Sequence, residues 1–335
     1  MTTIAVVGAT GAVGRTMLSI LDQRGFPVTE LRLAASARSA GQKAQTLNGE
    51  VEIEDLAEMD PRGIDIALFS AGGDRSRAHA NRFAEAGVVV IDNSSAFRMD
   101  PGVPLVVVGV NDHALSGHRG IVANPNCTTM TLMMAAGPLH EAAGLRSIVA
   151  TSYQAVSGSG QRGVDELLAQ QGPLGADVEA LMGGGWEDPG PRIYERPIAF
   201  NVLPFAGSET EDGYTDEEMK LVNESRKILG IPDLEVEPTC VRVPVLVGHG
   251  VAANMFFERE LSADEAMTVL GSAPGLELWK DRTPTPLDSA GMDDVLVGRV
   301  RGTVSRQGGI NLWVVGDNLR KGAALNAVQI AELVL

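Results

Sequence analysis

The sequence predicts an α/β protein of two domains, and three observations support this. The chain has 335 residues, more than one hydrophobic core usually holds. Residues 1–125 alternate short apolar strands with amphipathic helical stretches, as in a parallel sheet connected by crossover helices. After Cys127 the β-rich segments become longer, which is typical of a mixed or antiparallel sheet with a few helices. We therefore expect an N-terminal Rossmann-type parallel-sheet domain and a second α+β domain.

The individual elements follow from apolar runs and their flanking turns. Candidate strands of the first domain are Ile4–Val7, Leu31–Ala35, Ile66–Ser70, Val88–Asp92, Leu105–Val108 and Ile121–Ala123. Those of the second domain are Ser147–Val156, Val236–Val247, Val251–Arg259, Val295–Val304 and Ile310–Val315. Between them, Gly172–Pro197 is rich in glycine and proline and predicts an irregular loop or a subunit contact. Lys321–Leu335 has partial helical spacing of its apolar residues, so we expect a packed helix.

Charge and cysteine content exclude several function classes. Forty-three acidic residues against 27 basic ones give a formal charge of −16, which opposes binding to nucleic acid or to an anionic membrane. No apolar run reaches membrane-spanning length, and no cleavable apolar segment precedes the first strand. The two cysteines, Cys127 and Cys240, lie far apart in sequence, which favours reduced thiols in a cytoplasm. No metal site is predicted.

A glycine-rich loop follows the first strand and opens the first helix. Glycines there permit a tight turn and bring backbone N–H groups at the helix N-terminus close to a pyrophosphate. A glycine triplet alone could be a structural turn, but strand, loop and helix together favour dinucleotide binding. The expected cofactor contacts in this loop are Gly8, Thr10, Gly11, Ala12, Val13 and Gly14.

The end of the second strand indicates which dinucleotide binds. An NAD-selective domain usually has an acidic residue there, whereas this strand runs into Ser36-Ala37-Arg38-Ser39. Arg38 can pair with a 2′-phosphate, and Ser36 and Ser39 offer hydroxyls, so the sequence predicts NADP. The alternative is an exposed loop arginine. Ser70 and Gly72 follow another strand at its carboxyl end, where open α/β sheets bind ligands.

Cys127 lies at the junction between a strand and an apparent helix. Asn124-Pro125 reads as a turn and Thr128–Ala143 as a helix, so the thiol should belong to the first helical turn. Unpaired N–H groups and the helix dipole favour a thiolate at such a position. The alternative is a small buried apolar side chain.

Six separated motifs, taken together, resemble the aspartate-semialdehyde dehydrogenase family over nearly the full length. They are Gly8–Gly14, Asn93–Arg98, Asn124–Thr129, Ser152–Gly158, Arg242–Val245 with Gly248-His249, and Asp317–Gly322. The resemblance implies a glyceraldehyde-phosphate-dehydrogenase-like architecture and a homo-oligomer, usually a dimer. It places an NADP-binding domain at 1–126 plus 320–335 and a catalytic and dimerisation domain at 127–319.

The same resemblance implies a reaction. Cys127 would attack the carbonyl carbon of L-aspartyl 4-phosphate, phosphate would depart, and NADPH would reduce the resulting thioester to L-aspartate 4-semialdehyde. His249 matches the acid/base, and Gln154 matches the residue that orients the acyl-enzyme.

Substrate recognition needs cations for phosphate and carboxylate and an anion for the ammonium group. By resemblance, the phosphate ligands are Arg98, Asn126 and Lys220, the carboxylate ligand is Arg242, and the ammonium partner is Glu217. Near the nicotinamide, the matched positions are Ser157, Gly158 and Asn318. Some of these residues could have a purely structural role instead. Thr215 and Glu218 resemble a helix capping box, and Glu217 with Lys220 resembles a solvated ion pair.

Two features depart from simple expectation. Arg242 and His249 are seven positions apart, so an uninterrupted strand would point them to opposite faces, although Pro244, Gly248 and Gly250 offer places for a bend. The family commonly has a Pro-Glu-Val-Asn-like turn where this chain has Val108–Asn111, and often a hydroxyl residue where Gly250 stands.

Two other functions compete with this one. N-acetyl-glutamyl-phosphate reductase uses similar cysteine chemistry on a longer acylated substrate, but its nucleophile motif differs. A non-catalytic NADP-binding redox sensor would use Cys127 as its reporting thiol.

Overall fold

The computed structural model describes residues 2–46, 49–190 and 193–335. These residues form two compact units. The first contains the chain up to Gly137 together with Asn223–Asp233 and Leu319–Leu335. The second contains Pro138–Val222 and Leu234–Asn318.

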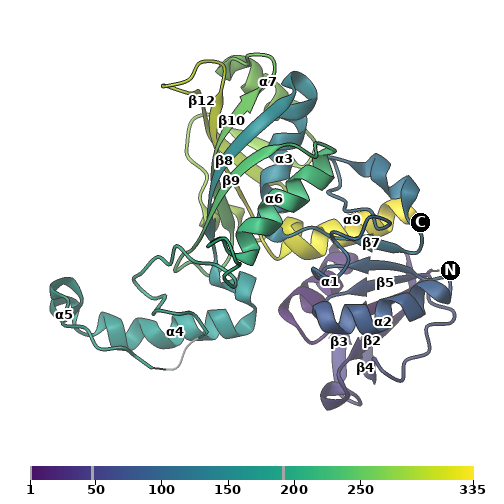
Figure 1. Cartoon of the computed structure of the whole chain (residues 1–335). Helices are drawn as coiled ribbons and strands as arrows, with labels where there is room; N and C mark the ends of the chain where they lie inside the picture. The colour runs from purple at the N-terminus through teal and green to yellow at the C-terminus, as the bar shows by residue number, and fades with distance from the viewer. Residues whose placement is uncertain (1, 47–48, 191–192) are drawn as a thin grey trace. The chain divides into compact units, whose positions relative to one another are not determined.

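The first unit is built on a sheet of seven strands in the order β3-β4-β2-β1-β5-β6-β7 (Figure 1). The strands are β1 (Thr2–Val7), β2 (Val28–Ala35), β3 (Lys43–Thr46), β4 (Gly49–Asp55), β5 (Ile66–Phe69), β6 (Val89–Asp92) and β7 (Ile121–Ala123). All neighbouring pairs are parallel except β3 with β4. The expected parallel sheet is therefore confirmed, with an antiparallel edge.

Helices cover both faces of this sheet. They include α1 (Ala12–Gln23), α2 (Gly73–Glu85) and α9 (Leu325–Val334), with short turns at Ala37–Ser39, Asp112–Gly117 and Arg320–Ala324. Ile4 and Val6 of β1 pack in one core with residues of α1 and α9, whereas Ala5 and Val7 pack in another with residues of α2. The period-two alternation of an extended strand thus buries both of its faces.

One prediction for this unit was wrong, and one pair of strands was not predicted. Leu105–Val108 is not a strand, and only an isolated bridge joins Leu105 to Ala123. The N–H groups of Val107 and Val108 donate to side-chain oxygens of Asn111 and Asn326, so they are not available to a neighbouring strand. The hairpin of β3 and β4 was missed because its residues are mostly polar.

The second unit contains a mixed sheet of six strands in the order β11-β12-β13-β10-β8-β9. The strands are β8 (Leu145–Gln154), β9 (Glu235–Arg242), β10 (His249–Phe257), β11 (Leu276–Trp279), β12 (Val295–Gly302) and β13 (Ile310–Gly316). The mixed sheet confirms the expectation from the longer β-rich segments. The bounds of β8, β10 and β12 differ from the predicted ones by at most two residues. Two differences are larger: β9 ends at Arg242 instead of running to Val247, and the short β11 was not predicted.

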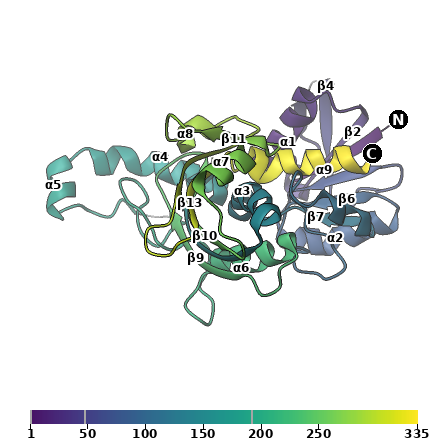
Figure 2. The same cartoon turned by 90° about the horizontal axis from the view of Figure 1, so that it is seen from above.

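Helices of the second unit include α7 (Ala263–Ser272), α8 (Pro286–Ser289) and a pair that extends away from the sheet in both views (Figures 1 and 2). This pair is α4 (Gln161–Gly175) and α5 (Val178–Gly183). The prediction of an irregular loop at Gly172–Pro197 was therefore partly wrong, since the segment includes the end of α4 and all of α5. Residues 191 and 192 of that segment lie outside the described residues. Two further helices, α3 (Cys127–Ala143) and α6 (Asp216–Leu229), have residues in both units.

Candidate active site

The glycine loop after β1 packs closely against neighbouring backbone atoms. Gly8 has a φ of 88°, and a Cβ there would lie 2.3 Å from the carbonyl oxygen of Ser70. A Cβ on Gly14 would lie 2.3 Å from the carbonyl oxygen of Gly8. The N–H of Gly11 donates to Gly8 O at 3.0 Å, and α1 begins at Ala12. These positions require glycine, and the loop leads into a helix N-terminus that suits a phosphate.

The segment after β2 forms a short 3₁₀ turn, Ala37–Ser39. Arg38 is exposed, and among the described residues its guanidinium has no hydrogen-bond or ion-pair partner. Gly72, with a φ of 87°, precedes α2 at the carboxyl end of β5. Since β2, β1 and β5 are adjacent and parallel, the three candidate cofactor segments lie at one edge of the sheet.

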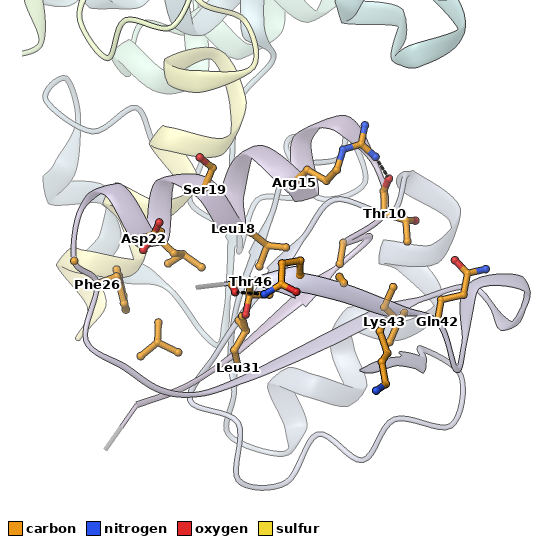
Figure 3. A pocket seen from close by; sticks show the side chains of 17 residues that line it. Thr10, Arg15, Leu18, Ser19, Asp22, Phe26, Leu31, Gln42, Lys43 and Thr46 are labelled. Carbon is orange, nitrogen blue, oxygen red and sulfur yellow. Dashed lines mark hydrogen bonds between the residues drawn. The ribbon is translucent and has the colours of Figure 1, made fainter. Parts of the chain in front are cut away.

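A cavity of about 860 Å³ lies along α1, and residues of β2, β3, β4 and the adjoining loops complete its lining (Figure 3). Thr10 is the one predicted cofactor residue in its lining. Arg15 points to the loop, and its Nη1 donates to the carbonyl oxygen of Thr10. This cavity was not predicted, because part of its wall belongs to the β3–β4 hairpin, which was missed.

Cys127 is the first residue of α3, which agrees with its predicted place in the first helical turn, and its side chain is partly exposed. The side-chain oxygen of Asn126 accepts hydrogen bonds from the N–H groups of Thr128 and Thr129, at 2.9 and 3.3 Å. Asn126 therefore caps the helix, and those two N–H groups are engaged. The dipole of α3 remains as a source of thiolate stabilisation.

The second cysteine is a free thiol that is buried within a strand. Cys240 is fully buried in β9, and burial raises the pKa of its thiol to about 12. It is therefore a protonated core residue at neutral pH.

Arg98 is buried and tied to its surroundings by three nitrogens. Nε donates to Asn124 O at 2.9 Å, Nη2 to Asn93 O at 3.1 Å, and Nη1 lies 3.0 Å from Oε1 of Glu224. Sequence reasoning missed Glu224. No local signal indicates this contact, because Glu224 lies 126 positions from Arg98 along the chain.

In the second unit, Gln154, Arg242 and His249 lie at one end of the sheet. Gln154 of β8 is aligned with Arg242 of β9, and β10, on the other side of β8, begins at His249. The seven-residue spacing is resolved because the chain leaves one strand and enters another between the two residues. A Cβ on Gly158 would lie 2.9 Å from Arg242 Nη1 and 3.0 Å from His249 Nε2. Both side chains thus occupy the space beside this glycine.

The imidazole of His249 is neutral and its tautomer is set by a neighbour. The side chain is fully buried, and the N–H of Ala155 donates to Nδ1 at 3.0 Å. Burial, aided by the positive charge of Arg242, lowers the pKa of His249 to about 3. The ring proton is therefore on Nε2, which has no hydrogen-bond partner among the described residues.

Arg242 and Gln154 are also buried. Arg242 Nη1 donates to Ala155 O at 2.9 Å, and the guanidinium lies 5.9 Å from the centre of the Tyr194 ring. Its Nε has no partner within the described part of the chain. The amide of Gln154 donates to the hydroxyl of Ser152 at 3.2 Å. Arg242 Nε and His249 Nε2 are thus both buried donors without a partner in the described residues. Such unsatisfied donors are typical of a site that binds a ligand.

Ser157 and Asn318 contact each other in the second unit. Asn318 Nδ2 donates to Ser157 Oγ at 2.9 Å, and Asn318 Oδ1 accepts from the N–H of Gly248, next to His249. Both residues are buried. Their contact links the segment after β13 to the turn before β10.

Glu217 and Lys220 form an ion pair on α6. Lys220 Nζ lies 2.6 Å from a carboxylate oxygen of Glu217 and 2.6 Å from one of Asp216. Burial alone would lower the pKa of Lys220, but the two carboxylates outweigh it and the pKa is raised. The expected capping box is present too, since Thr215 and Glu218 exchange side-chain-to-backbone bonds of 2.8 and 3.3 Å.

The predicted residues therefore gather in separate groups. Arg98, Asn126 and Cys127 belong to the first unit, and Gln154, Arg242 and His249 to the second. Within the described residues, no group of three or more His, Cys, Asp or Glu side chains could hold a metal ion. In the same part of the chain, no helix is long and apolar enough to cross a membrane.

Comparisons with known proteins define the class of this protein. The family model "Semialdehyde dehydrogenase, NAD binding domain" matches residues 3–118. The model "Semialdehyde dehydrogenase, dimerisation domain" matches residues 137–321. Together they define a semialdehyde dehydrogenase, an oxidoreductase with a Rossmann-like domain and a second, mixed-sheet domain, so the predicted fold class is confirmed.

Individual relatives narrow the class. The chain is 56% identical to an aspartate-semialdehyde dehydrogenase of Streptomyces akiyoshiensis over 99% of this chain and 98% of that protein. It is 52% identical to one of Corynebacterium glutamicum over the whole of both chains. A crystal structure of aspartate semialdehyde dehydrogenase II of Vibrio cholerae, complexed with ASA, superposes with a TM-score of 0.94 at 45% identity, covering 100% of this chain and 98% of that one. The chain therefore belongs to the aspartate-semialdehyde dehydrogenase family, whose enzymes act in aspartate-family amino-acid biosynthesis.

Proposed function

We propose that this protein carries out the reductive dephosphorylation of L-aspartyl 4-phosphate to L-aspartate 4-semialdehyde through a thioester on Cys127, with NADP as its cofactor. The observation that carries the proposal is the position of Cys127 as the partly exposed first residue of α3, within a chain of this family. The thiolate attacks the carbonyl carbon, a C–S bond forms, and the bond from that carbon to the phosphate oxygen breaks. Bound NADPH supplies the hydride that reduces the acyl group.

His249 acts in this proposal as a proton donor. Its proton is on Nε2, while Nδ1 already accepts from Ala155. The neutral imidazole can therefore donate to a developing negative oxygen, and it takes up that role without first being protonated from solution. Service as the base for the Cys127 thiol requires the Ala155 bond to break or the proton to move to Nδ1.

Two sets of side chains would recognise the substrate. Arg242 is the proposed carboxylate ligand, because its Nε has no partner in the described residues and a guanidinium fork fits a carboxylate. Arg98, Asn126 and Lys220 are the proposed phosphate ligands. Glu217 is the proposed ammonium partner, a role it would share with its ion pair to Lys220.

The NADP assignment rests on the loop after β2. The Gly8–Gly14 loop would hold the pyrophosphate, with Ser70 and Gly72 at the same sheet edge. Arg38, with Ser36 and Ser39, would hold the 2′-phosphate; Ser157, Gly158 and Asn318 would lie near the nicotinamide. Arg38→Ala should reduce the preference for NADP over NAD by about tenfold or more. An unchanged ratio of kcat/KM values for the two cofactors would refute this assignment.

We also infer a cytoplasmic homodimer. The matching dimerisation model and the low cysteine count support this. The domain division predicted from the sequence, 1–126 plus 320–335 and 127–319, stays a proposal. It differs from the compact units described above, which group 127–137 and Asn223–Asp233 with the N-terminal part of the chain. Sedimentation equilibrium of the purified protein would test the dimer.

One assay tests the reaction itself. Wild type should reduce NADP when given L-aspartate 4-semialdehyde and phosphate, with little activity when phosphate is omitted. Cys127→Ser should lose nearly all of this activity, whereas Cys240→Ser, a conservative change in the buried thiol, should keep it. Turnover of N-acetylglutamate semialdehyde in preference would favour the reductase, and cofactor binding without turnover would favour the redox sensor.

A further inference from the structure

Glu224, in the part of α6 that belongs to the first unit, joins two separate elements of the proposed site. Its side chain is 1% exposed. Oε1 lies 3.0 Å from Arg98 Nη1, and Oε2 accepts the N–H of Asn126 at 2.6 Å. The Glu224 carboxylate thus binds the Arg98 guanidinium with one oxygen and the backbone N–H of Asn126, the residue before Cys127, with the other.

The contact with Glu224 orients the guanidinium of Arg98 and leaves some of its N–H groups available. A guanidinium has five N–H groups in a fixed plane. Glu224, Asn124 O and Asn93 O each engage one nitrogen, so the plane is fixed while N–H groups remain for a phosphate oxygen. A buried ion pair of this kind contributes little net stability, but its geometry is specific.

The contact also holds the turn at the nucleophile. Asn126 is anchored through its own N–H to Glu224, while its side chain caps α3 through Thr128 and Thr129. The residue next to Cys127 is therefore fixed on both sides. Displacement of this turn would move the sulfur relative to Arg98.

Lys227, three positions after Glu224 on the same helix, strengthens the arrangement. Its Nζ donates to the carbonyl oxygens of Arg98, Asp100 and Val103, at 2.6, 2.9 and 2.8 Å. The same turn of α6 therefore holds the backbone of Arg98 as well as its side chain.

We propose that Glu224 is a positioning residue of the reaction, which sets the phosphate-binding arginine and the nucleophile against each other through its two oxygens. This inference rests on the proposed function for the roles of Arg98 and Cys127. It assigns Glu224 no contact with substrate.

Glu224→Gln tests the proposal. The two contacts use different carboxylate oxygens, and in glutamine one of these positions becomes an NH₂ group that cannot accept, so one of the two donors, Arg98 Nη1 or Asn126 N–H, faces another donor. We expect the phosphate concentration that half-protects Cys127 from iodoacetamide to rise about tenfold. The phosphate KM should rise in parallel and kcat should fall, while the KM for NADP stays within about twofold. If Glu224→Gln does not fold, Glu224→Asp keeps the charge but is one methylene too short for both contacts, and a smaller rise is expected.

Glu218→Gln is the matched control. Glu218 is a buried carboxylate of the same helix that also accepts backbone N–H groups, from Thr215 and Cys240. It should lower thermal stability and leave phosphate protection unchanged. The proposal is overturned if folded Glu224 variants keep wild-type phosphate protection, if Glu218→Gln shows the same rise, or if phosphate does not protect wild-type Cys127.

Protection of Cys127 by phosphate is measured without turnover, so the role of Glu224 is tested separately from the proposed reaction. A wild-type protein that phosphate protects but that does not reduce NADP would refute the proposed function. The comparison of half-protecting concentrations would still decide the role of Glu224.

Discussion

Arg98 and Arg242 are both buried arginines assigned to anion binding, yet their surroundings differ. Arg98 pairs with the carboxylate of Glu224 and has each of its nitrogens bound. Arg242 has one bond to a carbonyl oxygen, an Nε without a partner in the described residues, and no carboxylate paired with it there. Burial of an arginine alone therefore does not identify a ligand site. The internal counterion fixes the orientation of Arg98 and leaves only its remaining N–H groups for a ligand. Arg242 has no carboxylate partner among the described residues, so its charge is available to a ligand as well.

Replacing each of these two arginines should change the stability of the protein by different amounts. Arg98→Met should lower the free energy of unfolding by about 3–5 kcal/mol, because it leaves the Glu224 carboxylate buried without its cation. Arg242→Met removes one neutral-acceptor hydrogen bond and should cost about 1–2 kcal/mol. Urea unfolding of both variants measures the difference.

Arg98→Met/Glu224→Gln is the control for this comparison, since it removes both charges. It should recover much of the stability lost in Arg98→Met. Equal losses for Arg98→Met and Arg242→Met would contradict the distinction between the two sites.

The stability of the protein should depend on pH through the buried imidazole of His249. Its pKa is about 3 in the fold and about 6.5 in an unfolded chain, so protonation favours unfolding. The stability that the neutral imidazole contributes is complete above pH 6.5 and is lost as the pH falls from there towards 3. Relative to His249→Gln, wild type should lose about 2.5 kcal/mol between about pH 7.5 and pH 4.5. A stability difference that stays constant over this range would show that His249 is not buried in its neutral form.

The smallest effect is expected at Gly158. A Cβ there would lie 2.9 Å from Arg242 Nη1 and 3.0 Å from His249 Nε2, so Gly158→Ala must displace one of them. We expect kcat to fall about tenfold with a change in unfolding free energy of about 1 kcal/mol. Gly172→Ala is the control, since Gly172 lies in α4 with nothing within 4 Å of its Cβ position. Wild-type kcat in Gly158→Ala would show that this space is not part of the site.

Much of this site could be predicted from the sequence because its chemistry is carried by local motifs. Cys127 at a strand-to-helix junction and the Gly8–Gly14 loop need only neighbouring residues to be recognised. The β3–β4 hairpin was missed although Val51 and Ile53 alternate with acidic residues, a strand signal that its polar composition obscured.

The remaining features depend on contacts between distant parts of the chain. Leu105–Val108 has the composition of a strand, but a side chain from residue 326 takes one of its N–H groups. Glu224 has no motif of its own, and its function as a link exists only once α6 meets the turn before α3. The tautomer of His249 likewise depends on the Ala155 N–H, 94 positions away.

The central claim is that the substrate carbon becomes covalently bound to Cys127 during turnover. Rapid-quench mass spectrometry of wild type mixed with L-aspartyl 4-phosphate, without reduced cofactor, tests it most directly. The account predicts an aspartyl adduct on the peptide that contains Cys127, absent from Cys127→Ser and removed when NADPH is added. Accumulation of semialdehyde with no adduct at any time, or with the adduct on another residue, would contradict the account.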